Sequence, residues 1–201
     1  GISLTSTELA SITAGSLIIG GGTNGNITVE GVSSTDSDQF GALTLNATAS
    51  GSSVTFETAD SFFQGLTVNA ADAINISSNL TTNGTTSFNS DSNATGIGDF
   101  ILSSSLSTTN NALSVTANGL VLTGTLSSGT AGTTILASQA ASTIGLGTSN
   151  CGGTCGLSLT STELGKITAG SLTIGDGSNG NITVEGVSST DSDQFGLVTL
   201  N

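Results

Sequence analysis

The sequence predicts an all-β protein built as a parallel β-solenoid, and three observations predict it. The first is a long internal repeat, the second is an alternation of apolar and polar residues, and the third is a regular spacing of turns rich in Gly and Asn. Alternation with a period of two is typical of strands that have one buried face. A long tandem repeat favours a solenoid, in which each coil stacks on the previous one, over a sandwich or a barrel.

Residues 156–201 are a near-copy of residues 1–46. The two segments align without a gap at an offset of 155, and 38 of the 46 positions are identical. We therefore divide the chain into one full repeat, 1–155, and the start of the next repeat, 156–201, within one continuous solenoid. We expect the chain to be a window on a longer tandem array. At about 20–25 residues per coil, a repeat holds about six to eight coils and lengthens the rod by roughly 30–40 Å.

Short apolar–polar–apolar triplets mark the expected strands, and their middle residue is most often Thr, Ser or Asn. They occupy residues 43–45, 54–56, 66–68, 74–76, 113–115, 120–122, 172–174, 182–184 and 198–200. The apolar residues are expected to fill a narrow core, while the polar residues stack in ladders outside. Gly and Asn between the triplets tolerate the positive φ that tight corners require.

Two segments depart from the period of two. Thr5 and Glu8, and their copies Thr160 and Glu163, have the Thr-x-x-Glu spacing of a helix capping box. In that motif the Thr side chain and the Glu side chain each accept a hydrogen bond from a free backbone N–H at a helix start. We expect a turn or two of helix, or a bent corner, at both places.

Charge and composition exclude several classes of function. The formal net charge is −13, Lys166 is the only basic residue, and the chain has no His. Nucleic-acid binding needs clustered Lys and Arg, so we expect no nucleic-acid partner. No apolar run approaches the ~20 residues that span a bilayer, so we expect no membrane insertion. Triads that use a His base are excluded within this chain, and we expect a non-enzymatic protein.

One stretch resembles a known family. The residues from Leu159 to Val184 contain Glu-Leu-x-x-Ile-Thr-Ala-Gly-Ser-Leu-x-Ile-Gly followed by Gly-Asn-Ile-Thr-Val, and residues 112–138 are similar in style. This resembles the repeats of large bacterial exoproteins of the filamentous-haemagglutinin type. The resemblance implies a right-handed parallel β-helix, secretion across the outer membrane of a Gram-negative bacterium, and an adhesive or structural fibre. The resemblance implies no catalytic residues in this chain.

We therefore expect an extracellular or cell-surface protein that self-associates through adjacent repeats or chains into a fibre or matrix. Surfaces or glycans are further expected partners. High identity between repeats suits a function that depends on length and multivalency.

Cys151 and Cys155 are the only cysteines. In an extracellular chain an even pair indicates a disulfide, and the intervening Gly-Gly-Thr can bend enough to bring the sulfurs together. The alternatives are a link to a neighbouring chain or protein, and free or metal-bound thiols.

Asp36 and Asp38, repeated as Asp191 and Asp193, form the sharpest acidic cluster. Carboxylates two residues apart, together with carbonyls and water, can hold Ca²⁺, the one cofactor that the sequence suggests. A solvated acidic turn is the alternative. Because paired carboxylates also cleave glycosidic bonds, a polysaccharide-binding or polysaccharide-cleaving β-helix is the alternative function. Outward Thr ladders make an ice-binding adhesin segment the second alternative.

Overall fold

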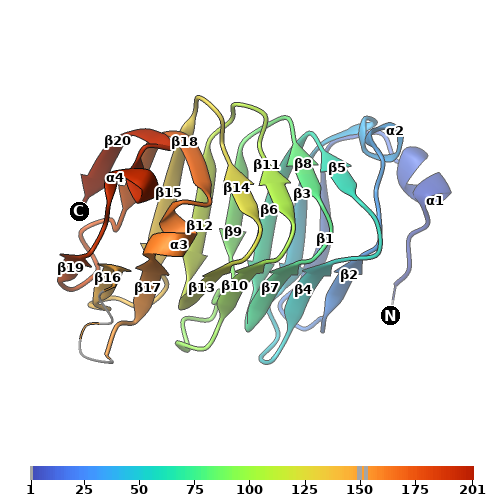
Figure 1. Cartoon of the computed structure of the whole chain (residues 1–201). Coiled ribbons are helices and arrows are strands. Elements are labelled where there is room, and N and C mark those ends of the chain that lie inside the picture. Colours follow the sequence, from blue (N-terminus) through green and yellow to red (C-terminus); the bar gives the residue numbers. More distant parts are fainter. Residues whose placement is uncertain (1, 149–150, 152–153) are drawn as a thin grey trace.

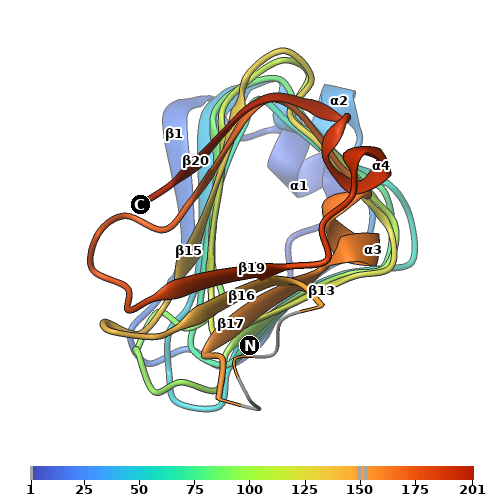
Figure 2. The same cartoon turned by 60° about the vertical axis from the view of Figure 1, so that its left-hand side comes forward.

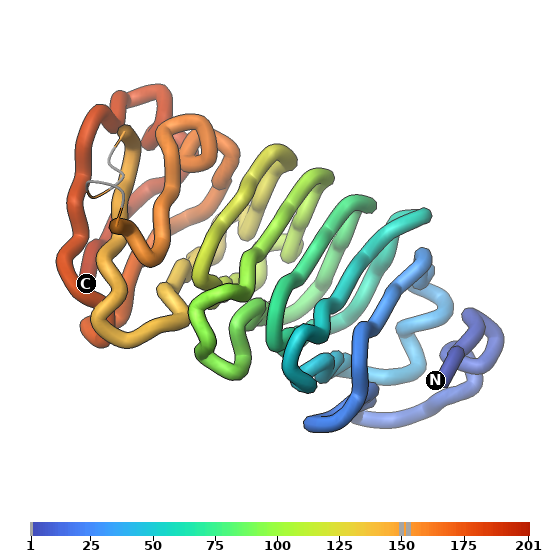
Figure 3. The backbone as a smooth tube through the Cα atoms, turned by 90° about the horizontal axis from the view of Figure 1, so that it is seen from below, coloured from blue at the N-terminus to red at the C-terminus, as the bar shows by residue number. Residues whose placement is uncertain are grey.

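The structure is a computed structural model that describes residues 2–148, 151 and 154–201. It is mostly β, with parallel strands, and Figure 1 shows them side by side along a rod. In Figure 2, which looks more nearly along the rod, successive turns of the chain superpose around one core. The two ends of the chain lie at opposite ends of the rod (Figure 3).

The strands lie on three faces. The first face holds β1 (Ala14–Gly21), β3 (Phe40–Ala47), β6 (Gly65–Ala70), β9 (Thr86–Asn89), β12 (Leu113–Ala117), β15 (Gly132–Ala137), β18 (Ile167–Ile174) and β20 (Phe195–Leu200). The second holds β2 (Ile27–Val29), β4 (Ser53–Phe56), β7 (Ala73–Ile76), β10 (Asp99–Leu102) and β13 (Gly119–Leu122). The third holds β5 (Ser61–Phe63), β8 (Leu80–Thr82), β11 (Ser105–Ser107) and β14 (Thr125–Ser127). Strand β18 bends around a corner, since its start pairs with β14 and its end with β15.

The alternation in the sequence becomes an alternation of buried and outward side chains. Strands such as β12 bury every second residue, and the buried residues stack in register from coil to coil. One such column on the first face runs Leu45, Val68, Phe88, Val115, Ile135 and Ile174, and it ends at Leu200, which is 43% exposed in the last strand. Neighbours in the column are 20 to 27 residues apart in the chain, except for one step of 39 residues between Ile135 and Ile174. The steps of 20, 20 and 23 residues match the predicted coil length of about 20–25 residues, and those of 26 and 27 residues are slightly longer.

Four short helices interrupt the strands in the described part of the chain. They are α1 (Ser6–Ala10), α2 (Ser34–Ser37), α3 (Ser161–Leu164) and α4 (Ser189–Ser192). The predicted capping boxes are present: Thr5 and Glu8 cap α1, and Thr160 and Glu163 cap α3. The helix α2 and its copy α4 were not predicted, although Ser33 and Asp36 have the same i, i+3 spacing and form a capping box.

The step of 39 residues contains an added strand. The chain leaves β15 and forms β16 (Ile144–Gly147), then β17 (Leu157–Thr160), and later β19 (Ile182–Glu185). In space the order is β17, β16, β19, so β17 comes later in the chain but lies nearer to β13. At the junction the N–H of Leu122 in β13 donates to Oε1 of Glu163, 3.1 Å away. The Glu163 side chain of α3 therefore accepts from a backbone N–H of β13, the last strand of the second face, which has no further strand hydrogen-bonded to it on that side.

Candidate functional site

The two near-copies lie at opposite ends of the rod and expose opposite sides. Leu45 is 1% exposed, whereas its copy Leu200 is 43% exposed. The reverse holds for Leu4, which is 38% exposed, and its copy Leu159, which is 0% exposed. The first copy is covered by the coils that follow it, and the second copy by the coils that precede it. Each end therefore presents apolar side chains that the other copy buries.

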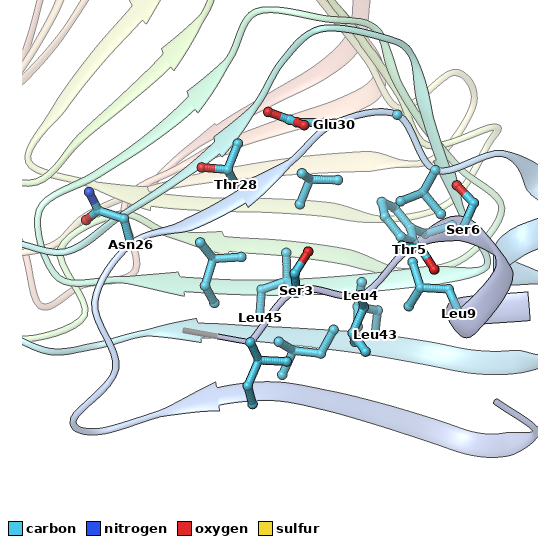
Figure 4. Close-up of a pocket in the computed structure, with 17 residues that line it drawn as sticks. Ser3, Leu4, Thr5, Ser6, Leu9, Asn26, Thr28, Glu30, Leu43 and Leu45 are labelled. Carbon is cyan, nitrogen blue, oxygen red and sulfur yellow. The ribbon is translucent and has the colours of Figure 1, made fainter. Parts of the chain in front are cut away.

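The N-terminal end contains a groove of about 640 Å³ between residues 2–5 and the strand β2. Leu43, Leu45 and Phe63 from the following coils also line it. Figure 4 shows Ser3 and Leu4 on one side of this space and Thr28 of β2 with the flanking Asn26 and Glu30 across from them, with Leu45 and Leu43 beneath. The groove is thus apolar at its base and lined along both sides by extended backbone.

Polar groups near this groove are fixed by the local helix. The carboxylate of Glu8 accepts hydrogen bonds from the N–H and the hydroxyl of Thr5, both at 2.8 Å. These bonds, that from the backbone first, hold the pKa of Glu8 below its ordinary value, because they favour the charged form. They also fix the chain direction where residues 2–5 lead into α1.

The predicted cysteine pair forms a disulfide within the chain. The sulfurs of Cys151 and Cys155 are 2.11 Å apart and the Cα atoms 5.1 Å apart. The bridge lies in the connection from β16 back to β17. The hydroxyl of Thr143 donates to the carbonyl of Thr154 at 3.0 Å, which ties this connection to the start of β16.

Replacing both cysteines by serine is expected to lower the free energy of unfolding by about 2 kcal/mol, since a cross-link over so short a loop removes little unfolded-state entropy. Urea denaturation of the oxidised protein and of the double variant would measure the loss. A reductant should weaken the original protein equally and leave the variant unchanged. A loss of the folded state in the variant would contradict a purely local role for the bridge.

The acidic cluster predicted for Ca²⁺ is used in helix capping. Oδ2 of Asp36 accepts from the N–H of Ser33 at 2.9 Å and from its hydroxyl at 2.7 Å. The hydroxyl and then the backbone bond lower the pKa of Asp36. Asp38 accepts from the side-chain amide of Gln39, and the copies Asp191 and Asp193 repeat this pattern.

In the described residues no three His, Cys, Asp or Glu side chains gather closely enough to hold a metal ion. Ca²⁺ binding at Asp36 and Asp38, or at Asp191 and Asp193, stays a prediction.

A different carboxylate, that of Asp91, accepts several hydrogen bonds, and the sequence analysis did not identify it. Asp91 is 2% exposed. It accepts from the N–H groups of Thr95 and Gly96, both at 2.9 Å, from the hydroxyl of Ser138 at 2.6 Å and from the amide of Gln139 at 3.3 Å. Burial raises its pKa, but these bonds outweigh burial and leave the pKa below its ordinary value. Asp91 thereby links the loop 91–98 to the end of β15.

A ladder of hydroxyls runs along the outside of the first face. Its members are in register on neighbouring strands and are all half-buried: Thr44, Thr67, Ser87, Ser114, Thr134, Thr173 and Thr199. The spacing between strands is about 4.8 Å, so the hydroxyls form a regular row. Beside it, the side-chain amide of Asn69 donates to that of Asn46 at 2.9 Å. The predicted polar ladders are therefore present.

Searches for related proteins gave no match among protein-family models, curated proteins or solved structures. No helix in the described part of the chain is long and apolar enough to cross a membrane.

Proposed function

We propose that this chain is a repeat of a secreted, non-enzymatic structural or adhesive protein, whose repeats continue end to end as a right-handed parallel β-solenoid and build a cell-surface fibre or matrix. The observation that carries the proposal is the complementary exposure of the two near-copies. Side chains that are bare at one end of the rod are buried in the same sequence at the other end. A continuous array would bury both sets.

Energetics favour such continuation. The exposed residues at the C-terminal end whose counterparts are buried include Val184, Val198 and Leu200, and those at the N-terminal end include Ile2 and Leu4. Covering apolar surface releases about 25 cal/mol per Å², and open strand edges also gain hydrogen bonds when another strand pairs with them. End-to-end contact with a further repeat therefore stabilises each open end of the rod.

An extracellular or cell-surface location of a Gram-negative bacterium is part of this proposal. The disulfide supports it, because such bonds persist in oxidising compartments. The acidic surface, with a net charge of −13, keeps a long Ser-rich and Thr-rich rod soluble. The resemblance to filamentous-haemagglutinin-type repeats points the same way.

The row of hydroxyls favours a second candidate function, the binding of a polysaccharide along the first face. Hydroxyls repeated from strand to strand can exchange hydrogen bonds with a repeating polymer. Replacing Thr67 and Thr134 by Val would test it, since retention on an insoluble polysaccharide should fall while the fold persists. An ice lattice is another repeating partner. Thermal hysteresis, measured for the original protein and for the variant with both Thr residues replaced, would distinguish ice binding from polysaccharide binding.

Electron microscopy of the native array tests the principal proposal. From β1 to its copy β18 the first face advances by six strand steps, which at about 4.8 Å each gives an axial repeat near 29 Å. We expect uniform fibres with a layer line at this spacing and another near 4.8 Å. Short compact particles, or repeats that fold back as separate units, would contradict the proposal.

A further inference from the structure

We infer that the first face of the rod binds the first face of a second copy of this chain, so that two rods pair side by side. This inference goes beyond the proposed end-to-end joining, because it concerns the side of the rod and not its ends. The contact surface on each copy is an uncharged sheet face that presents hydroxyl, amide and apolar side chains.

The strands of the first face carry no charged side chain, although the chain as a whole is strongly acidic. The net charge is −13, yet none of these described strands contains Asp, Glu, Lys or Arg. All 14 acidic residues lie in the helices, in β10 and β19, or in segments between these elements. Like charges that are brought together across a contact oppose association. Two copies therefore approach with little repulsion when their first faces meet.

The other two faces are less suited to such a contact. The second face contains Asp99 in β10, and Glu57 directly follows β4. The strands of the third face are uncharged, but each has only three residues, Asp60 directly precedes β5, and the helix α2 adjoins β5. The first face is thus the broadest uncharged surface on the described part of the rod.

The area of the first face is sufficient for a specific contact. Its strands have four to eight residues, and six residues at about 3.3 Å each give a width of about 20 Å. Its eight strands, spaced by about 4.8 Å, extend over roughly 34 Å. Two such faces together cover roughly 1,400 Å², and specific protein interfaces bury about 1,200–2,000 Å².

Apolar residues among the hydroxyls favour a protein partner. Ile18, Leu136 and Leu197 point outward on the first face, where they pair with Thr44, Thr116 and Ser171 of neighbouring strands. Ile18 and Leu197 are exposed, and Leu136 is half-buried. Covering such side chains releases free energy, and the centres of protein interfaces are depleted of charged residues. The composition of the first face agrees with both features.

A second copy also matches the spacing of the polar rows. Beside the hydroxyl row, Asn46, Asn69 and Asn89 form an amide row on successive strands. Both rows repeat at the strand spacing of about 4.8 Å, which a copy of the same rod shares. A two-fold axis parallel to the rod would set the hydroxyl row of each copy against the amide row of the other. Hydroxyls and amides can each donate and accept, and the match recurs at every strand.

Sedimentation equilibrium of the full 201-residue chain tests the pairing. We expect a reversible dimer that becomes tighter as salt is added, because salt screens the repulsion between two acidic rods. Between about 0.01 M and about 0.15 M salt the Debye length falls from about 30 Å to about 8 Å, and the dissociation constant should fall roughly tenfold. A chain that stays monomeric at both salt concentrations, or a dimer that weakens with salt, would overturn the inference.

Two matched substitutions locate the contact. Thr67→Asp places a carboxylate in the hydroxyl row of each copy, and the dissociation constant should rise at least about tenfold. The control is Thr55→Asp, because Thr55 is half-buried and outward like Thr67 but lies in β4 of the second face. It should leave dimerisation unchanged. Ile18→Asp repeats the first test at an exposed position, where folding is not at risk. Equal dissociation constants for Thr67→Asp and Thr55→Asp would contradict pairing through the first face.

Side-chain amide signals give an independent readout in the ¹⁵N-labelled chain. Asn69 lies on the first face and Asn75 on the second, and both are half-buried in one copy. A soluble paramagnetic chelate should broaden both signals in dilute protein. In concentrated protein it should still broaden Asn75 but spare Asn69. Equal broadening of Asn69 at both concentrations would show that the first face stays open.

Other occupants of the first face would give different results. A chain that stays monomeric but is retained on an insoluble neutral polysaccharide, and loses retention with Thr67→Asp, would assign this face to a glycan. Thermal hysteresis that disappears in the same variant of a monomeric chain would assign it to ice. Either outcome would overturn pairing between copies.

Electron microscopy of the native array separates this inference from the fibre proposal. We expect paired rods in the original protein and single rods with an unchanged axial repeat when Thr67→Asp is present. Single rods in the original protein would preserve the proposed fibre and remove the side-by-side contact. Dimers of the chain without fibres would preserve the contact and remove the fibre.

Discussion

Replacing Phe88 by alanine is expected to lower the free energy of unfolding by about 3 to 5 kcal/mol, the usual cost of deleting a fully buried aromatic ring. Phe88 is 0% exposed, and its ring centre lies 5.2 Å from that of Phe100 on the second face. The pair spans the narrow core between two faces. Because strands above and below fix the backbone in register, the cavity cannot close. Urea denaturation followed by circular dichroism would measure the loss.

The matched control is Phe62→Ala. Phe62 follows the same alternation but is only half-buried, and its neighbour Phe63 is the residue that fills the core. Phe62→Ala should cost clearly less than Phe88→Ala. Equal costs for the two variants would mean that the inward and outward faces are assigned wrongly.

Replacing Asp91 by alanine is expected to lower the free energy of unfolding by about 2 to 4 kcal/mol, because donors that lose their acceptor remain buried or poorly hydrated. The carboxylate joins the loop 91–98 to Ser138 and Gln139, which are 47 and 48 residues away in the chain. The variant should therefore also increase hydrogen exchange at Thr95 and Gly96. Asp38→Ala, which removes an exposed carboxylate, is the control and should have little effect.

The contribution of Asp91 depends on pH in a definite direction. Its pKa in the folded protein lies below its ordinary value, so the unfolded chain binds the proton more readily. The stabilisation is fully present above the unfolded pKa of about 3.9 and is lost as pH falls through the lower folded pKa. Unfolding midpoints of the original protein and of Asp91→Asn should thus converge below about pH 4. A constant difference down to pH 2 would contradict this account.

Part of the structure follows from local sequence. The triplets at 43–45, 66–68 and 113–115 lie in strands with their outer two residues buried, because a strand turns alternate side chains to opposite faces. Thr5 and Glu8 begin a helix because their side chains bond to nearby backbone N–H groups. These features involve residues a few positions apart, and the sequence shows them directly.

Other elements were missed because their environment is made by distant residues. Thr86 and Thr133 lie in the inward column beside Leu66, Leu113 and Leu172, although their polarity suggests an outward position. They are tolerated because each hydroxyl has a partner within its own coil, Thr82 for Thr86 and Ser128 for Thr133. The strand β16 was missed for the opposite reason, since its Ile-Gly-Leu-Gly has no polar residue to mark a face.

The sequence by itself determined the repeat, which is visible by direct alignment, and the short strands and the helices α1 and α3, because alternation and capping depend on residues that are near in the chain. Only the tertiary structure decided that β17 lies between β13 and β16 although it follows β16 in the chain. It also decided that Asp91 joins two loops, and that residues 2–5 and β2 border a groove. Each of these depends on contacts between segments tens of residues apart. Their free energy comes from burial and hydrogen bonds that exist only once the coils have stacked.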